Sequence, residues 1–259
     1  MSALTLRIIA CICMLLDHIG YCFAGRYPFL TPLRWIGRIA FPLYVFLIVN
    51  GFRHTSNRPR YALRLLIFAV ISQVPFALMT HPKNMLGTLN VFVTLLLALL
   101  TVWATDEMRK RRFTKYLCFL PTIAVYFLYY FGLIRSDYGA KGVLLAMTFY
   151  LFEGNIVLTA IGMLVSIYHA YVLHYPISAA FFLVQRLRGR AYTIAPLTAP
   201  NGWQMAQLFC LVSLVFILLY NGKKGKTPSS KAGAKAVQLG FYLFYPAHML
   251  LLYALRRLL

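Results

Sequence analysis

The first apolar segment, residues 4–24, carries ionisable side chains where a membrane helix usually carries none. Arg7 lies near its start, and the adjacent pair Asp17 and His18 follows later in the segment. Charged groups cost free energy inside a bilayer, so those that occur there usually face a bundle interior or a watery cavity. Histidine titrates near neutral pH, and a nearby carboxylate fixes its tautomer and raises its basicity. His18 is therefore a candidate general base, with Asp17 as its partner.

The spacing of Arg7 and His18 supports a shared site. On an α-helix it places the two side chains within about 20° of one face and about 16 Å apart along the axis. Asp17 diverges from His18 by about 100°, so it is expected either to poise His18 or to meet a partner on another helix. A polar pair that only holds helices together is the alternative interpretation.

Two arginines in the second apolar segment are candidates for binding an anion. Arg34 and Arg38 are spaced i and i+4, just before Phe41 and Pro42, and so project from one helix face. Guanidinium forks suit phosphate or a developing oxyanion. The alternative is that they reach outward to lipid headgroups. We assign Arg38 to catalysis and Arg34 to cofactor binding.

The last apolar segment contains the residues FYLFYPAHML, 241–250. Tyr245 and His248 are spaced i and i+3 and can face one site, next to a carbonyl that Pro246 frees. The alternative is an aromatic belt residue with an unrelated histidine. Among isolated polar residues in apolar helices, Asn90 is our choice as a cofactor ligand, although helix–helix hydrogen bonding explains most such residues. No metal-binding spacing, phosphate-binding glycine loop or defensible Ser-His-Asp order is found.

The composition predicts an all-α polytopic integral membrane protein, in one domain spanning residues 1–259. Apolar residues make up 61% of the chain, and runs of about 20 apolar residues are typical of transmembrane helices. Residues 176–188 are ambiguous, either an interfacial helix or the second half of a tenth span broken at Pro176. We therefore expect a bundle of about nine, possibly ten, transmembrane helices. They are placed near residues 4–24, 36–53, 60–79, 86–105, 115–134, 139–153, 156–175, 203–221 and 237–257.

The charge is strongly positive, with 26 basic residues against five acidic ones. Most of the basic residues lie in short connections between apolar runs, where they act as topology signals and contact anionic lipid. Nucleic-acid binding is therefore not expected. The basic connections around residues 53–64 and 109–115 should be cytoplasmic, which places the N-terminus in the cytoplasm. With nine spans, the basic loop at residues 223–235 lies on the same side.

Several stretches of the chain resemble the TraX family, whose founding member acetylates the N-terminal amine of a pilin. They include LTLRIIACICMLLDHIGY at residues 4–21, GRIAFP at 37–42 and FYPAH at 244–248. The TraX family in turn is similar to a broad superfamily of membrane acyltransferases that includes glycan O-acetylating enzymes. That superfamily carries an Arg-x10-His pair in its first helix, which Arg7 and His18 match. The resemblance implies a multi-pass protein of the bacterial inner membrane.

The resemblance implies acyl transfer from acetyl-CoA to a peptide N-terminus, a glycan or a small acceptor. Phosphates of acyl-CoA would lie near Arg7 and the basic loops, and the thioester near His18. His18 would act as general base or form a transient acyl-histidine, while Arg38, Tyr245 and His248 would stabilise the oxyanion. A secondary transporter with a buried Arg/Asp/His proton relay is the alternative function. A pure assembly scaffold is a third possibility, in which those residues would be replaceable.

Overall fold

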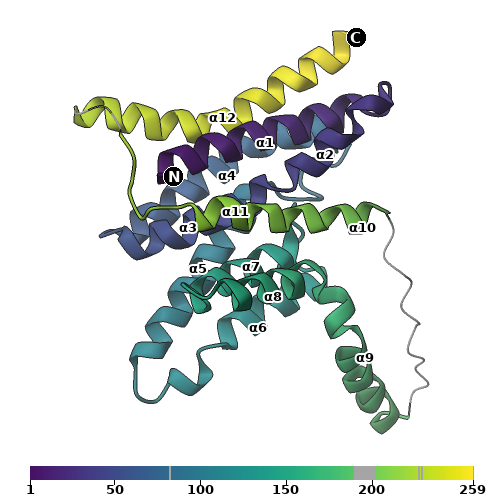
Figure 1. The fold of residues 1–259 in the computed structure, drawn as a ribbon. Coiled ribbons are helices and arrows are strands. Elements are labelled where there is room, and N and C mark those ends of the chain that lie inside the picture. The colour runs from purple at the N-terminus through teal and green to yellow at the C-terminus, as the bar shows by residue number, and fades with distance from the viewer. Residues whose placement is uncertain (82, 190–201, 227, 229, 259) are drawn as a thin grey trace.

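The computed structural model describes residues 1–81, 83–189, 202–226, 228 and 230–258, and Figure 1 shows its course. Helices form almost all of this part, with an isolated β-bridge between Leu89 and Ser136. The α-helices are α1 (Ala3–Phe23), α2 (Thr31–Gly37), α3 (Ala40–His54), α4 (Arg58–Thr80), α5 (Val91–Lys110), α6 (Leu120–Tyr130), α7 (Gly139–Leu151), α8 (Ile156–Ile167), α9 (His169–Leu187), α10 (Gly202–Ala206), α11 (Ser213–Leu218) and α12 (Lys231–Leu258). Short 3-10 turns occupy Pro28–Leu30, Lys115–Leu117 and Gln207–Val212.

The long helices have the length and composition of membrane spans. Among the described residues, five helical stretches qualify, or six when the bent pair α8 and α9 counts as one. The outward face of α4 is apolar, with Leu63, Val70 and Val74 each more than half exposed, while Leu65 and Phe68 on the other face are buried. A helix that is apolar on both faces needs lipid around it. The fold is therefore that of an all-α membrane protein.

Several predicted spans are shorter or more broken than expected. The predicted helix at residues 115–134 is reduced to α6, because Pro121 restarts the helix at its first turn and Gly132, with φ of 69°, ends it. Residues 203–221 are divided among α10, a 3-10 turn and α11. The count of nine is thus not reached by long helices alone.

Of the two alternatives for residues 176–188, the one with a break at Pro176 is not seen. Helix α9 continues through Pro176, and the chain instead turns by 75° between α8 and α9, at Tyr168. The φ and ψ of Tyr168, −104° and 22°, lie outside the α-helical range, so the change of direction is made there. In Figure 1, α9 projects away from the bundle. Residues 190–201, where the tenth-span question also falls, lie outside the described residues.

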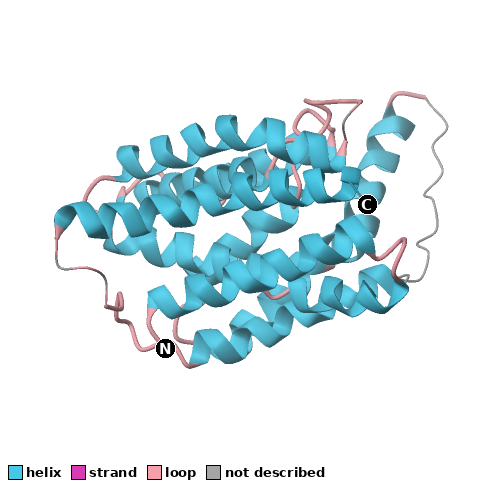
Figure 2. Ribbon diagram, turned by 90° about the horizontal axis from the view of Figure 1, so that it is seen from above, coloured by secondary structure: helices cyan, strands magenta, loops and turns pink. Residues whose placement is uncertain are grey.

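Helix α1 lies at the centre of the part that positions the site. It packs against α2, α3 and α12, and Figures 1 and 2 show α1 and α12 running side by side. Cys11 contacts Tyr44 of α3 at 3.1 Å, and Asp17 pairs with Arg38, which lies just before α3 begins, so α1 and α3 are antiparallel. Side chains far apart in the sequence therefore meet at the same depth.

The three basic connections gather at one end of the bundle. The N–H groups of Ala3 and Leu4 donate to the carbonyl oxygens of Lys223 and Lys224 at 2.9 and 3.1 Å, which joins the N-terminus to the third connection. The first connection meets the second where Arg58 pairs with Glu107 at 2.7 Å. Because α1 and α3 are antiparallel, these groups share one end, as the positive-inside pattern predicts.

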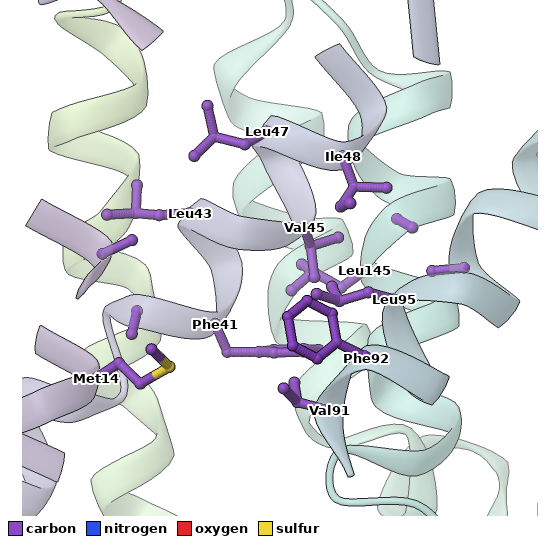
Figure 3. Close-up of a cluster of buried hydrophobic side chains, with 14 of the residues drawn as sticks. Met14, Phe41, Leu43, Val45, Leu47, Ile48, Val91, Phe92, Leu95 and Leu145 are labelled. Carbon is purple, nitrogen blue, oxygen red and sulfur yellow. The ribbon is translucent and has the colours of Figure 1, made fainter. Parts of the chain in front are cut away.

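A cluster of apolar side chains lies between this end and the opposite one. Figure 3 shows α3 sending Leu43 and Leu47 to one side and Val45 and Ile48 to another, so that both of its faces are covered. The side chain of Leu43 is fully buried, as is that of Val45. In the same view (Figure 3) Phe41 lies between Met14 and Phe92. This cluster thus holds α3 against α1, α5 and α7.

Candidate active site

A cavity of about 740 Å³ extends along the interior of the bundle. Its lining includes Lys224 and Arg7 at the end where the basic connections gather, and His18, Arg34 and Arg38 toward the other end. The sequence placed Arg7 and His18 on one face of the first helix, and both line this cavity. The bundle therefore holds a polar interior that joins a cationic mouth to a titratable histidine.

Asp17 is the hub of an ion-pair cluster between α1 and α2. Its Oδ1 accepts from Nη2 of Arg38 at 2.5 Å and lies 2.9 Å from Nη1 of Arg34. Nε of Arg38 also donates to the carbonyl oxygen of Arg34 at 3.1 Å, which orients its guanidinium. The three side chains are 8–16% exposed. Arg34 is thus held by Asp17 and does not extend toward headgroups, and the trio carries a net positive charge inside the protein.

Gly37 permits this cluster to form. A Cβ atom at Gly37 would lie 2.2 Å from Cβ of Asp17, far inside van der Waals contact, so α2 can approach α1 this closely only with glycine there. The glycine of the GRIAFP stretch therefore has a steric reason. It lets the two arginines that flank it reach the same carboxylate.

His18 is paired with His248 and not with Asp17. Nδ1 of His18 lies 2.6 Å from Nε2 of His248, and Nδ1 of His248 lies 2.6 Å from the carbonyl oxygen of Phe244. A carbonyl oxygen only accepts, so His248 carries its hydrogen on Nδ1 and presents a lone pair at Nε2. With both rings neutral, His18 donates from Nδ1 to that lone pair. Nε2 of His18 is left with its own lone pair, which is the state that a general base requires.

Of the two partners expected for Asp17, the structure shows the one on another helix, so Asp17 does not poise His18. Neighbouring helix positions diverge, and packing directs Asp17 toward α2 while His18 faces α12. His248 performs the orienting role that a carboxylate was expected to perform. The prediction that His248 belongs to the site is retained, but it contacts the base and does not line the cavity among the described residues.

Tyr245 lines the cavity beside this pair. The centroid of its ring lies 6.2 Å from that of His18 and 5.9 Å from that of His248, both in edge-on geometry. Its hydroxyl is buried without a hydrogen-bond partner among the described residues. An unsatisfied buried hydroxyl is costly, and its cost is reduced when a ligand oxygen reaches it.

The mouth of the cavity holds Arg64, which was not among the predicted site residues. Arg64 lines the cavity with Arg7 and Lys224, stacks over the ring of Tyr61 at 5.4 Å, and has a buried Nε without a partner in the described chain. Its position in the first turns of α4 resembled that of any loop-flanking arginine. The one available signal was its place inside the helix, nearly two turns after α4 begins at Arg58.

Asn90 has a structural role instead of the predicted ligand role. Its Oδ1 accepts from the N–H of Phe92 at 3.0 Å and caps α5, and its Nδ2 donates to the carbonyl oxygen of Ala69 at 2.6 Å and to Oε1 of Gln73 at 2.9 Å. Asn90 is fully buried and does not line the cavity. These hydrogen bonds use its donors and acceptor, so it is not part of the site.

Asp137 contributes a further carboxylate to the cavity. It lies in the connection before α7, lines the cavity, and is open to it. Protein atoms nevertheless surround it, and this desolvation raises the pKa of its carboxyl to about 6, against the lowering effect of Arg38. No hydrogen bond or ion pair of this carboxylate is found in the described chain. It is a carboxylate that faces the same cavity as His18.

Comparisons with known proteins agree on one family. The family model described as "TraX protein" matches residues 2–256. A probable fimbrial assembly protein, FimC of serogroup H1 from Dichelobacter nodosus, is 30% identical over 265 residues, which cover 97% of this chain and 94% of that protein. No solved structure matches the chain significantly. The link to the wider acyltransferase superfamily is not tested by these matches and stays a prediction.

Proposed function

Because the chain belongs to the TraX family, we propose that it is a membrane-embedded acyltransferase that moves an acetyl group from acetyl-CoA to an amine or hydroxyl. The observation that carries this proposal is the arrangement of the interior cavity. Cationic side chains line one end of the cavity, and His18, with a lone pair at Nε2, lies deeper inside it. The fimbrial relative favours an acceptor at the cell surface, either a peptide N-terminus or a glycan.

The donor enters from the end where the basic connections gather, which the positive-inside rule assigns to the cytoplasm of a bacterial inner-membrane protein. Arg7, Arg64 and Lys224 offer charge-assisted donors to the nucleotide phosphates of coenzyme A. The helical rise between Arg7 and His18 is about 16 Å, a length that suits the extended pantetheine arm. The thioester carbonyl then lies beside His18.

In the chemical step, Nε2 of His18 takes the proton from the amine or hydroxyl of the acceptor. The freed nucleophile attacks the thioester carbon and forms a tetrahedral oxyanion. The oxyanion collapses, the carbon–sulfur bond breaks, and the thiolate of coenzyme A takes the proton back from Nε2 of His18. His248 holds the ring of His18 in the required tautomer throughout. The alternative with a transient acyl-histidine uses the same nitrogen.

The oxyanion is stabilised by charge and by one hydroxyl. Arg34 and Arg38 share the single carboxylate of Asp17, so the cluster faces the cavity with a net positive charge. The unpartnered hydroxyl of Tyr245 can donate to the same oxygen. Both groups are in place before reaction, held by the packing of α1 against α2 and α12.

The test is calorimetric titration of acetyl-CoA into the purified protein, with His18→Ala, Arg7→Ala and Arg60→Ala variants alongside. Binding should persist in His18→Ala and weaken in Arg7→Ala. Arg60 is exposed in the first basic connection, so Arg60→Ala is the matched loss of charge that should leave binding unchanged. Absence of saturable binding in the folded wild type would rule out the donor and favour a carrier that uses the same buried charges.

A further inference from the structure

A second cavity of about 360 Å³ adjoins the first at the end away from the basic connections. Asp137, Tyr138 and Lys141 line both cavities, so single side chains separate the two there. The ring of Phe41 stacks on that of Tyr138 at 3.5 Å and fixes the middle of this partition. We propose that the second cavity binds the acceptor, and that the acceptor carries a carboxylate or phosphate beside its nucleophile.

The charges around the partition carry the first part of this inference. Four cationic side chains face two carboxylates in the described chain. The cations are Arg34, Arg38, Arg135 and Lys141, and the carboxylates are Asp17 and Asp137. Only Asp17 is paired with arginines by contact. A cavity with excess positive charge concentrates anions and disfavours a purely cationic ligand such as an isolated ammonium.

The cationic side chains and the carboxylate of the second cavity would bind different groups of the acceptor, and this sets its orientation. Arg135 and Lys141 lie along the second cavity and can hold an anionic group, whereas Asp137 repels it. Asp137 can instead accept a hydrogen bond from the amine or hydroxyl of the acceptor. Because Asp137 also faces the first cavity, that nucleophile is held at the partition, on the side of His18.

Aromatic side chains also line the second cavity, and they give the acceptor a surface to pack on. Tyr126 meets His169 edge to face, with ring centroids 5.7 Å apart. The hydroxyl of Tyr129 forms a hydrogen bond with the hydroxyl of Ser136 at 2.8 Å. This bond holds the Tyr129 hydroxyl next to the partition. Such a wall binds the apolar part of a ligand while a few polar groups set its orientation.

The proposal rests on the proposed function for calling this ligand the acceptor, and it is tested with two matched pairs of probes. Glycerol 3-phosphate and glycerol share a hydroxyl nucleophile, and alanyl-alanine and its C-terminal amide share an amine. In each pair, only the first compound carries the added anion. Binding is measured by calorimetry on the full-length protein, both wild type and His18→Ala, and coenzyme A release from acetyl-CoA is measured in parallel.

We expect the anionic member of at least one pair to bind roughly tenfold more tightly than its neutral partner, as one charge-assisted hydrogen bond provides. This preference should persist in His18→Ala and fall to near parity in Lys141→Met. Lys83→Met is the matched control, because Lys83 is exposed outside the cavity and its loss should change nothing. Lys141→Arg should retain the preference, which separates loss of charge from loss of fold.

Equal binding within both pairs, or a preference that survives in Lys141→Met, would overturn the inference. The pair that responds tells whether a hydroxyl or an amine is the nucleophile. Anion-selective binding without coenzyme A release would leave the anion site standing and overturn acyl transfer. Coenzyme A release without anion selectivity would support acyl transfer and overturn the anion site. The two proposals therefore fail independently.

Discussion

Nδ1 of His18 lies 2.6 Å from Nε2 of His248, although 230 residues separate the two in the chain. Their rings are nearly parallel, with an interplanar angle of 12° and centroids 4.9 Å apart. The first and last helices must therefore be in register before His18 acquires its tautomer. The carbonyl of Phe244 completes the chain of hydrogen bonds and fixes the direction of donation.

Replacement of His248 should impair turnover more than donor binding. In His248→Leu, His18 loses the acceptor for its Nδ1 hydrogen, and loss of an orienting partner typically costs about 10–100-fold in activity. The affinity for acetyl-CoA should stay unchanged, because His248 does not line the cavity. The rate of coenzyme A release and calorimetric binding measure the two effects separately.

His248→Gln serves as the rescue variant, because an amide oxygen can accept from Nδ1 of His18. It should recover part of the rate that His248→Leu loses, at an unchanged melting temperature. Equal activity in both variants would show that His248 contributes packing and not orientation. His54→Gln is a control at the other end of the cavity, where Nδ1 of that histidine contacts the carbonyl oxygen of Asn50 at 2.8 Å.

Gly37→Ala should destabilise the protein and disperse the arginine cluster. The added methyl group would lie 2.2 Å from Cβ of Asp17, so α2 must move away from α1. Overpacking of this kind costs about 1–3 kcal/mol. Gly240→Ala is the matched control in α12, because nothing lies within 4 Å of its added Cβ and alanine favours helix. Unfolding in detergent should show a loss for the first variant and none for the second.

Asp17→Asn should be strongly destabilising even though it changes no volume. Arg34 and Arg38 would keep their buried charges without the shared carboxylate, and removing one member of a buried ion pair costs about 3–5 kcal/mol. The double variant Asp17→Asn with Arg38→Met should recover part of that loss. Glu107→Gln is the comparison for an accessible pair, because its contacts with Arg58 and Lys110 lie near the surface. A loss in Glu107→Gln as large as in Asp17→Asn would contradict the burial argument.

Several side chains of the site were predictable from their type, because an ionisable side chain in an apolar helix usually faces the bundle interior or a polar cavity. Arg7, His18 and Arg38 were identified in this way, and each lines the cavity. Their partners were not predictable. Whether Asp17 meets His18 or an arginine depends on how α1 packs against α2 and α12, which periodicity does not contain.

Asn90 and Arg64 show the same limit of sequence-based prediction. Asn90 was assigned to the site and is not part of it, whereas Arg64 lines the cavity and was not assigned. A polar residue in an apolar stretch looks the same whether it caps a helix, as Asn90 does, or binds a ligand. An arginine near a basic connection looks like a topology signal, yet Arg64 turns into the cavity. Apolar periodicity likewise marked where helices lie, but not where Pro121 and Tyr168 interrupt them.

Arg64→Ala should weaken acetyl-CoA binding by about tenfold, because one charge-assisted hydrogen bond to phosphate is lost. The effect should shrink at high salt, since screening already weakens the contact. Arg60→Ala removes the same charge from an exposed position and should leave affinity unchanged. If calorimetry finds both variants equally weakened, general surface charge and not the cavity mouth attracts the donor.

Asp137 should give the protein a stability profile that falls as pH rises between about 4 and 6. Its carboxyl has a pKa near 3.8 when unfolded and about 6 when folded, because enclosure by protein disfavours the charged form more than Arg38, Arg34 and Lys141 favour it, while Asp17 adds repulsion. The folded state thus binds more protons in this window, and stability is lost as the group ionises through its folded pKa. In Asp137→Asn this component should vanish, so that the melting temperature of the variant exceeds that of the wild type at pH 7 by more than at pH 4. Parallel melting curves across this range for the two proteins would show that folding does not raise the pKa of Asp137.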